Sequence, residues 1–112
     1  MIDEFKYGFF KVDRKEHYGD IKIINDKVKQ WPSRERFILR KEDLKDIIEA
    51  KPDILIIGTG ATGLLQVSKE LQMELQQLRI KIYIEKTVQA CQRYNKLKRE
   101  LKNVHALLCA TC

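Results

Sequence analysis

The feature that most constrains the fold is the uninterrupted apolar run Ile54–Ile57, which leads directly into a glycine-rich turn. A strand with one face in water alternates apolar and polar residues, whereas a run without alternation is typical of a strand covered on both faces. Ile80, Ile82 and Ile84 indicate a second buried strand. Parallel neighbours of this kind are joined by helical crossovers. The run therefore predicts an α/β fold with a largely parallel central sheet.

Further segments show helical periodicity and would cover this sheet. Apolar residues recur every three or four positions in residues 41–50 and 64–78, and Thr87 is a favourable N-cap for a long last helix. Ser68 is also a good N-cap, so a later start of the second helix is an alternative. Residues 104–108 form the closing strand. The order from residue 41 is therefore helix, strand, helix, strand, helix, strand.

The first third of the chain predicts antiparallel strands. Residues 7–12, 21–25 and 28–31 are rich in apolar and β-branched side chains, and residues 37–39 suit a further short strand. The polar stretch 13–16 and an Asn-Asp turn signal separate the strands. Local pairing of this kind gives a β-meander, which would extend the edge of the central sheet or cover one of its faces.

Chain length and composition are those of a globular domain. The 112 residues fit a single domain, 1–112, that buries about two-thirds of its unfolded surface. Hydrophobic residues make up 44% of the chain and charged residues 34%, which is unlike a disordered sequence. The predicted fold is α/β, with a mixed, largely parallel central sheet, helices on one face and an N-terminal β-meander layer on the other.

The charge pattern and the apolar runs argue against two kinds of partner. The net charge is +6, but basic residues alternate with acids, as in Arg34-Glu35-Arg36, which is typical of a solvated surface rather than a nucleic-acid site. The longest apolar run is far too short to span a bilayer, and the acidic residues 1–4 do not resemble a signal peptide. We expect a cytoplasmic protein without membrane contact.

The cysteines form an odd set without the density of a disulfide scaffold: Cys91, Cys109 and Cys112. In a reducing compartment they are expected to be free thiols. The last two make a C-x-x-C pattern, but it follows a strand, so no helix N-terminus lowers a thiol pKa there. His17 and His105 lack the spacing of zinc ligands. We therefore expect a buried terminal strand with small side chains, no metal and no cofactor.

Residues Gly58–Gly63 form a G-x-G-x-x-G pattern between a strand and a helix. In a dinucleotide site such glycines let a pyrophosphate approach the backbone, and Glu85, 22 residues after Gly63, could bind a ribose hydroxyl. A complete Rossmann domain needs more strands than this chain has after its mid-chain glycines. The simpler interpretation is a strand-to-helix turn packed on the sheet. A small anion at the loop stays open as an alternative.

A specific pattern in the last helix suggests a family. Asn95 follows Tyr94 in mid-helix, where an amide competes with the backbone, so we expect it to make a tertiary hydrogen bond. The pattern is Thr87-x-x-Ala90-x-x-x-Tyr94-Asn95-x-Leu97, after the Gly58-x-Gly60 turn and before Val104 and Thr111-Cys112. It resembles a widespread family of small uncharacterised α/β proteins with archaeal and bacterial members. The family includes the cytosolic adipogenesis-associated Mth-domain protein and a mitochondrial assembly factor for respiratory complex I.

The resemblance implies a mixed sheet with helices on one face and a β-layer on the other, and no established catalytic activity. It also implies assembly or regulatory roles that act through partner contact. Our leading hypothesis is a small non-enzymatic interaction domain with a protein partner, steered by the basic face of the last helix. The candidate cleft, at the carboxyl ends of the two buried strands, comprises Gly58, Thr59, Gly60, Glu85, Thr87, Tyr94 and Asn95. The alternative is a binder of, or weak enzyme on, a small anionic metabolite or nucleotide at the Gly58–Gly63 loop.

Overall fold

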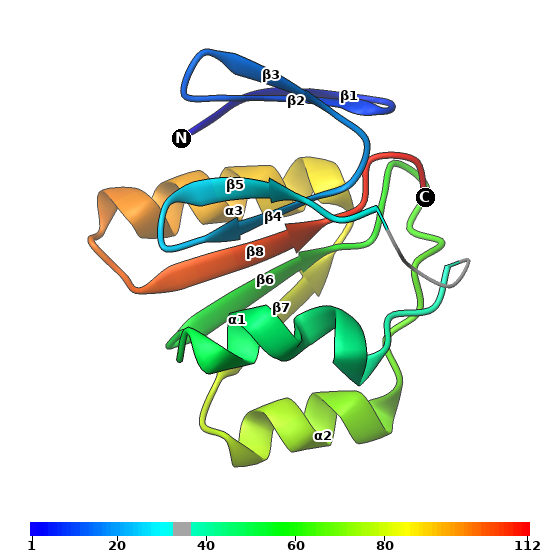
Figure 1. Cartoon of the computed structure of the whole chain (residues 1–112), viewed down its shortest axis with the longest axis vertical. Helices are drawn as coiled ribbons and strands as arrows, with labels where there is room; N and C mark the ends of the chain where they lie inside the picture. Colours follow the sequence, from blue (N-terminus) through cyan, green and yellow to red (C-terminus); the bar gives the residue numbers. More distant parts are fainter. Residues whose placement is uncertain (33–36) are drawn as a thin grey trace.

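The computed structural model describes residues 1–32 and 37–112, whose arrangement is shown in Figure 1. The strands in these residues are β1 (Ile2–Lys6), β2 (Phe9–Val12), β3 (Lys15–Tyr18), β4 (Ile21–Ile24), β5 (Lys27–Gln30), β6 (Ile54–Gly58), β7 (Lys81–Glu85) and β8 (Val104–Leu108). The helices are the short 3₁₀ helix η1 (Lys41–Leu44), α1 (Lys45–Glu49), α2 (Lys69–Gln77) and α3 (Thr87–Arg99). The predicted order of elements from residue 41 onward is confirmed.

The central sheet has the strand order β5-β4-β8-β6-β7. Strands β8, β6 and β7 run parallel to one another, while β4 is antiparallel to both β8 and β5. Every residue of β6 and of β8 is buried, which is why these strands lack an alternating pattern. The mixed α/β class is therefore confirmed. Its parallel part is the run of three strands formed by the C-terminal half of the chain.

The N-terminal strands divide between two sheets. Strands β1, β2 and β3 form a separate antiparallel sheet, and the β4–β5 hairpin joins the central one. The sequence did not predict β1 or β3, because β3 includes part of the polar stretch 13–16 and exposes nearly all of its side chains. The predicted strand at residues 37–39 is an isolated bridge between Ile38 and Gln66. The sequence left two places open for the N-terminal strands, and both occur: β1–β3 form a covering antiparallel layer, and the β4–β5 hairpin extends the edge of the central sheet.

Two apolar clusters fill the two faces of the central sheet. On one face, α3 packs together with the three-stranded sheet, and Phe10 and Tyr94 lie in the same cluster as Ile56. On the other face, α1 and α2 contribute Ile47 and Leu75 to a second cluster. Figure 1 shows the three-stranded sheet as a separate layer beside β4 and α3. The expected layering is corrected accordingly, because helices cover both faces and α3 shares its face with the β-layer.

The starts of the two later helices follow from side-chain hydrogen bonds. Ser68 caps α2 by accepting a bond from Leu71 N at 3.1 Å, so the later of the two predicted starts is confirmed. Helix α3 has Lys86 as its N-cap, and Thr87 is its first helical residue. Thr87 does not cap the helix because its hydroxyl bonds to Gly60 and Cys109 instead.

Candidate functional site

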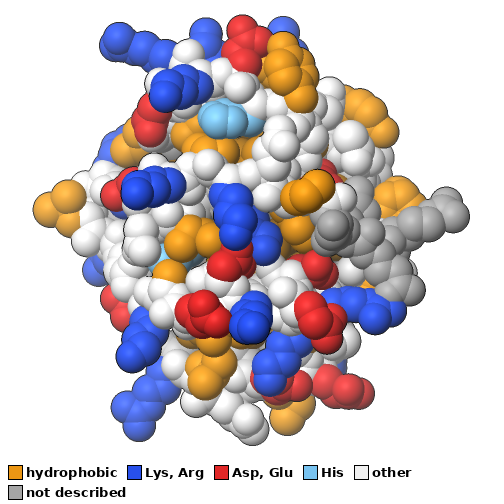
Figure 2. All heavy atoms as spheres, viewed as in Figure 1, with side chains coloured by type: hydrophobic (Ala, Val, Ile, Leu, Met, Phe, Trp, Pro, Cys, Tyr) orange, Lys and Arg blue, Asp and Glu red, His pale blue; other side chains and the backbone are white. Residues whose placement is uncertain are grey.

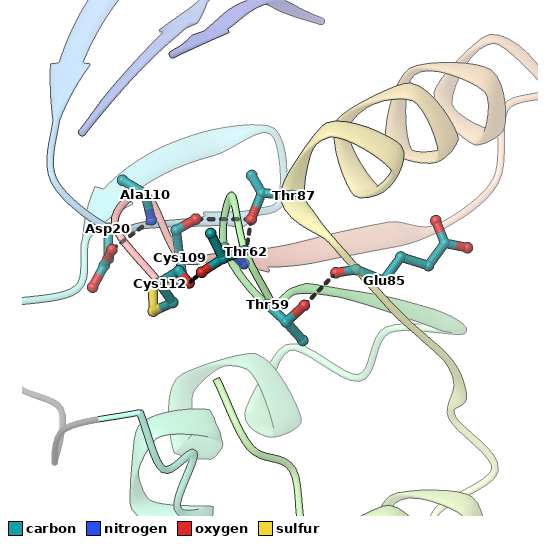
Figure 3. Close-up of a disulfide and its surroundings, with 9 residues drawn as sticks. Asp20, Thr59, Thr62, Glu85, Thr87, Cys109, Ala110 and Cys112 are labelled. Atoms are coloured by element: carbon teal, nitrogen blue, oxygen red, sulfur yellow. Dashed lines mark hydrogen bonds between the residues drawn. A yellow bond between two sulfur atoms is a disulfide. The ribbon is translucent and has the colours of Figure 1, made fainter. Parts of the chain in front are cut away.

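The carboxyl ends of β6 and β7 lie side by side, as expected, but β7 is a partly exposed edge strand and not the second buried strand that its isoleucines predicted. Gly58 is in register with Glu85, and the next amide, Thr59 N, donates to Glu85 O at 2.8 Å. The Thr59 hydroxyl donates to the same oxygen at 3.1 Å (Figure 3). The two strand ends therefore form one edge, and the glycine turn begins at that edge.

Hydrogen bonds of Thr87 fix the glycine turn, residues 58–63, in a closed conformation. Thr87 Oγ1 accepts a hydrogen bond from Gly60 N at 2.8 Å and donates one to Cys109 O at 2.8 Å. Its own backbone N–H donates to Gly60 O at 3.1 Å. Thr87 is completely buried, so these bonds are protected from competition by water. One hydroxyl thus connects the turn after β6, the start of α3 and the end of β8.

The segment after β8 covers the turn from the other side. The backbone oxygen of Cys112 accepts bonds from Leu64 N at 3.2 Å and from Thr62 Oγ1 at 2.5 Å. A Cβ atom added to Gly60 would overlap the backbone of Cys112, so the two backbones are in direct contact. Figure 3 shows the Thr62 side chain pointing towards the backbone oxygen of Cys112. The predicted cleft residues Gly58, Thr59, Gly60 and Thr87 come together, but as a buried junction.

Cys109 and Cys112 form a disulfide across this junction, with their Cα atoms 5.9 Å apart. The expectation of free thiols is wrong for this pair, because β8 and the chain after it bring two cysteines of a C-x-x-C pattern within bridging distance. The expectation of a free thiol holds for Cys91, which is buried. Burial raises the pKa of the Cys91 thiol to about 12. So short a loop gives the disulfide a chain-entropy contribution of only about 2 kcal/mol.

The residues between the two cysteines are tied to the N-terminal part of the chain. Ala110 N donates to the Asp20 carboxylate at 2.6 Å, and Ala110 O accepts from Gly8 N at 2.9 Å. Figure 3 shows Asp20 and Ala110 on the side of the disulfide away from Glu85. The segment 109–112 is therefore fixed by the glycine turn on one side and by the N-terminal strands on the other.

Glu85 is the predicted site residue that borders open surface. Its Oε1 accepts a hydrogen bond from Arg93 Nε at 2.5 Å, and the Arg93 guanidinium lies 4.2 Å from the centre of the Tyr83 ring. The Lys81 ammonium lies 5.3 Å from the same ring. A hollow of about 310 Å³ adjoins these groups and is lined by Glu85, Gln89, Gln92, Arg93 and Lys96. We call this surface the α3–β7 groove.

Sequence reasoning missed Arg93 and Tyr83 as members of a site. The sequence indicated only a basic face of the last helix, and neither residue was named as part of a site. A signal was available, because Tyr83 and Glu85 alternate on one face of a strand that leads straight into that helix. The groove is therefore lined by one side of α3 and by Glu85 at the end of β7, and Tyr83 supports Arg93 beside it.

Tyr94 and Asn95 serve the packing of α3 rather than the glycine turn. Tyr94 is 2% exposed within the core. The Asn95 side chain accepts a bond from Ile2 N and donates one to Ile2 O, both at 2.8 Å. The expected tertiary bond of Asn95 is thus present, and its partner is the edge of β1. Asn95 also lines a hollow of about 290 Å³ between β1 and α3.

A polar cluster joins the β4–β5 hairpin to α1. The Lys22 ammonium, on a side chain that is 9% exposed, donates to Asp43 O at 2.5 Å and to Asp46 Oδ1 at 3.0 Å. Lys29 bonds the second oxygen of Asp46 at 2.8 Å. Burial raises the pKa of Asp46, but the bonds from Lys29 and Lys22 outweigh it and lower that pKa. We interpret the cluster as structural, since the buried Lys22 ammonium and the partly exposed Asp46 carboxylate both have hydrogen-bond partners.

His105 is the residue from which we expect a dependence of stability on pH. It is 2% exposed on β8, and its Nδ1 has no hydrogen-bond partner among residues 1–32 and 37–112. Burial lowers the pKa of His105 below its ordinary 6.5; Asp26 raises this pKa and Lys98 lowers it further. Because the unfolded chain then binds a proton more readily than the folded one, stability is lost as the pH falls through the unfolded value.

We therefore expect the free energy of unfolding to decline as the pH is lowered from about 7.5 to about 5, by at most ~1.4 kcal/mol per pH unit from this residue. The His105→Leu variant should show a flatter profile over the same range, because leucine does not titrate. Urea denaturation at each pH measures both profiles. Equal slopes for the two proteins would show that another group controls the dependence.

The glycine turn is closed, and it lies in a small α/β domain with a mixed central sheet. Among the described residues, no three His, Cys, Asp or Glu side chains gather in a way that could hold a metal ion. The sequence model for a "Protein of unknown function (DUF498/DUF598)" matches residues 2–109. The chain belongs to this family.

Solved structures of similar proteins have the same fold. An outer membrane protein of Bartonella henselae is 28% identical, with a TM-score of 0.84 and an alignment over 99% of this chain and 94% of that one. A conserved hypothetical protein of Pyrococcus horikoshii is 25% identical, with a TM-score of 0.83 over 100% and 99%. A Mth938-like domain of Bordetella pertussis is 17% identical, with a TM-score of 0.70 over 97% and 84%.

No curated protein matches this chain at a significant level. The resemblance to a family of small uncharacterised α/β proteins is confirmed, whereas kinship with the adipogenesis-associated and complex I assembly proteins stays a prediction. No helix in residues 1–32 and 37–112 is both long and apolar enough to cross a membrane.

Proposed function

We propose that this protein is a small non-enzymatic interaction domain, of assembly or regulatory type, that binds an acidic segment of a partner protein in the α3–β7 groove. The observation that carries the proposal is the position of Arg93, which Glu85 and the Tyr83 ring hold in place at the border of the groove. A guanidinium fixed in this way has lost part of its conformational freedom before a partner arrives, which favours binding.

The chemistry of the groove suits a carboxylate-bearing partner. The hydrogen bond to Glu85 uses only the Nε–H of Arg93. The guanidinium has four further N–H donors, and their planar, forked arrangement matches the two oxygens of a carboxylate. Lys96, on the next turn of α3, adds a second exposed positive charge. Gln89 and Gln92 line the same hollow and offer amide donors and acceptors. The overall charge of +6 would steer an acidic partner towards the domain.

Two alternatives receive less support. An anion at the Gly58–Gly63 loop would need free backbone N–H groups, yet the amides of Thr59, Gly60 and Leu64 already donate to Glu85, Thr87 and Cys112. On the face that carries α1 and α2, Figure 2 shows acidic and basic side chains interspersed, unlike the continuous basic surface of a nucleic-acid binder. The triplet 34–36, which suggested this alternation in the sequence, lies outside the described residues.

Binding of a fluorescent poly-glutamate peptide, measured by anisotropy at low salt, tests the proposal. We expect the double variant Arg93→Glu/Lys96→Glu to bind about tenfold more weakly than the wild type, since two attractive contacts become repulsive. The matched control is Lys15→Glu, which changes an exposed charge on β3 and should bind much as the wild type does. Equal affinities of the double variant and the control would contradict the proposal.

The same variants serve in capture experiments from cell lysate, in which the natural partner should be lost from the double variant and kept by Lys15→Glu. Thermal shift separates the alternative of a small ligand. A rise in melting temperature with phosphate or a nucleotide that is unchanged in the double variant would favour the glycine loop instead.

A further inference from the structure

Strand β7 is an edge of the central sheet, and its three middle residues carry none of the charges that usually protect an edge. The other edge, β5, has lysines at positions 27 and 29, which discourage pairing with a further strand. In β7 the charges stand only at the two ends, Lys81 and Glu85, and the three residues between them are Ile-Tyr-Ile. Such residues favour strand pairing. The amino-acid composition of β7 therefore favours pairing with a further strand at this edge.

The directions of the backbone N–H and C=O groups along β7 show which of its residues would bond to an added strand. Lys81 N donates to Asp53 O at 2.9 Å, and Glu85 O accepts from Thr59 N at 2.8 Å, so these residues direct their backbone groups towards β6. Backbone groups alternate in direction along a strand. Tyr83 therefore also bonds inward, while Ile82 and Ile84 direct their N–H and C=O groups away from the sheet.

We propose that β7 pairs antiparallel with β7 of a second copy of this chain, about a two-fold axis at Tyr83. In this register Ile82 lies opposite Ile84 of the second copy, and each such pair exchanges two backbone hydrogen bonds because both residues point outward. The sequence Lys-Ile-Tyr-Ile-Glu is complementary to itself when reversed, which is what an isologous interface requires. The proposal does not depend on the acidic partner proposed above.

Side-chain charges select this register. Lys81 lies opposite Glu85 of the second copy, and Glu85 lies opposite Lys81, so two ion pairs form at the ends of the paired strands. These are non-hydrogen-bonded pairs, in which facing side chains approach most closely. The hydrogen bond from Arg93 already fixes the Glu85 carboxylate near the strand, where Lys81 of the second copy would reach it. A shift of the register by two residues would separate both charge pairs.

The two-fold axis passes between the two Tyr83 residues, which face each other on the side of the sheet that carries α3. Tyr83 is in register with Ile56 of the α3-facing cluster. Helix α3 of each copy therefore lies on the same face of the extended sheet. The α3–β7 grooves of the two copies would then adjoin, with the Tyr83 pair between them.

Charge reversal and charge exchange test the register. Sedimentation velocity of the full chain up to about 1 mM, a range that detects weak interfaces, should show a dimer for the wild type. Lys81→Glu places like charges opposite each other twice per dimer and should weaken association about tenfold or more. The exchange variant Lys81→Glu/Glu85→Lys restores both opposite pairs across the interface and should recover most of the dimerisation; the remaining loss comes from the new positive charge beside Arg93. A wild type that stays monomeric throughout this range, or a Lys81→Glu variant that dimerises equally well, would overturn the proposal.

Cysteine cross-linking tests the two-fold axis without relying on charge. Tyr83→Cys places two thiols directly opposite each other, and mild oxidation should give a covalent dimer. The matched control is Ile82→Cys, which lies opposite Ile84 of the second copy and should cross-link far less. Circular dichroism verifies that both variants are folded. Equal cross-linking of the two variants would exclude this register, even if the protein dimerises.

Discussion

Replacing Gly60 with alanine is expected to lower the free energy of unfolding by about 3 kcal/mol or more, and the melting temperature by roughly 10 °C. Gly60 has a φ of +107°, which an L-residue adopts only with strain. The new Cβ would also overlap the backbone of Cys112. Rotating a side chain relieves neither cost, because the backbone fixes the position of the new Cβ and the atoms that it meets are C, Cα and Cβ of Cys112. Urea denaturation followed by circular dichroism measures the change.

Gly19→Ala separates the two causes of this loss. Gly19 has a φ of +85°, but apart from its chain neighbours no atom of residues 1–32 and 37–112 lies within 4 Å of an added Cβ. Its replacement should cost only about 1 kcal/mol from backbone strain. Amide exchange at Leu64, which bonds the backbone oxygen of Cys112, adds a local measurement. If Gly60→Ala cost no more than Gly19→Ala, and Leu64 exchanged as slowly as in the wild type, the close contact between Gly60 and Cys112 would have no energetic importance.

The buried half of the fold could be predicted from the sequence because its signals are local. Ile54–Ile57 lacks alternation, and burial on both faces is the physical reason. The same reasoning placed β7 beside β6, and the register of Gly58 with Glu85 agrees with it. Ser68 identified the start of α2 because capping depends on a few neighbouring residues. In each case a periodicity or a cap within about ten residues decided the structure.

The exposed strands and the state of the candidate site could not be predicted in this way. β3 exposes polar residues and owes its structure to pairing with β2, which leaves no apolar pattern to recognise. The glycine turn looked open because nothing near it in sequence covers it. The residue that does so, Cys112, is some fifty positions away from Gly60 along the chain and is fixed there by tertiary hydrogen bonds. Whether a turn is covered by a distant segment depends on the complete fold. The glycine motif alone therefore predicts that a turn forms, but not whether the turn is accessible.

Thr87→Val is expected to destabilise the protein by about 2–4 kcal/mol, although valine has nearly the same shape as threonine. The substitution removes the hydroxyl that accepts from Gly60 N and donates to Cys109 O, and both of these backbone groups would then lack a partner in a fully buried site. Each buried group left unsatisfied costs on the order of 1–3 kcal/mol. The loss should therefore come from the polar groups and not from packing.

Thr87→Ser is the matched control, because it keeps the hydroxyl and removes only a methyl group, at a cost of about 1 kcal/mol. Thermal and urea denaturation of both variants give the two losses, and amide exchange at Gly60 reports whether the turn opens locally in Thr87→Val. We expect faster exchange at Gly60 in Thr87→Val and little change in Thr87→Ser. Should valine be tolerated better than serine at this position, the hydroxyl would not be what connects the glycine turn, α3 and the end of β8.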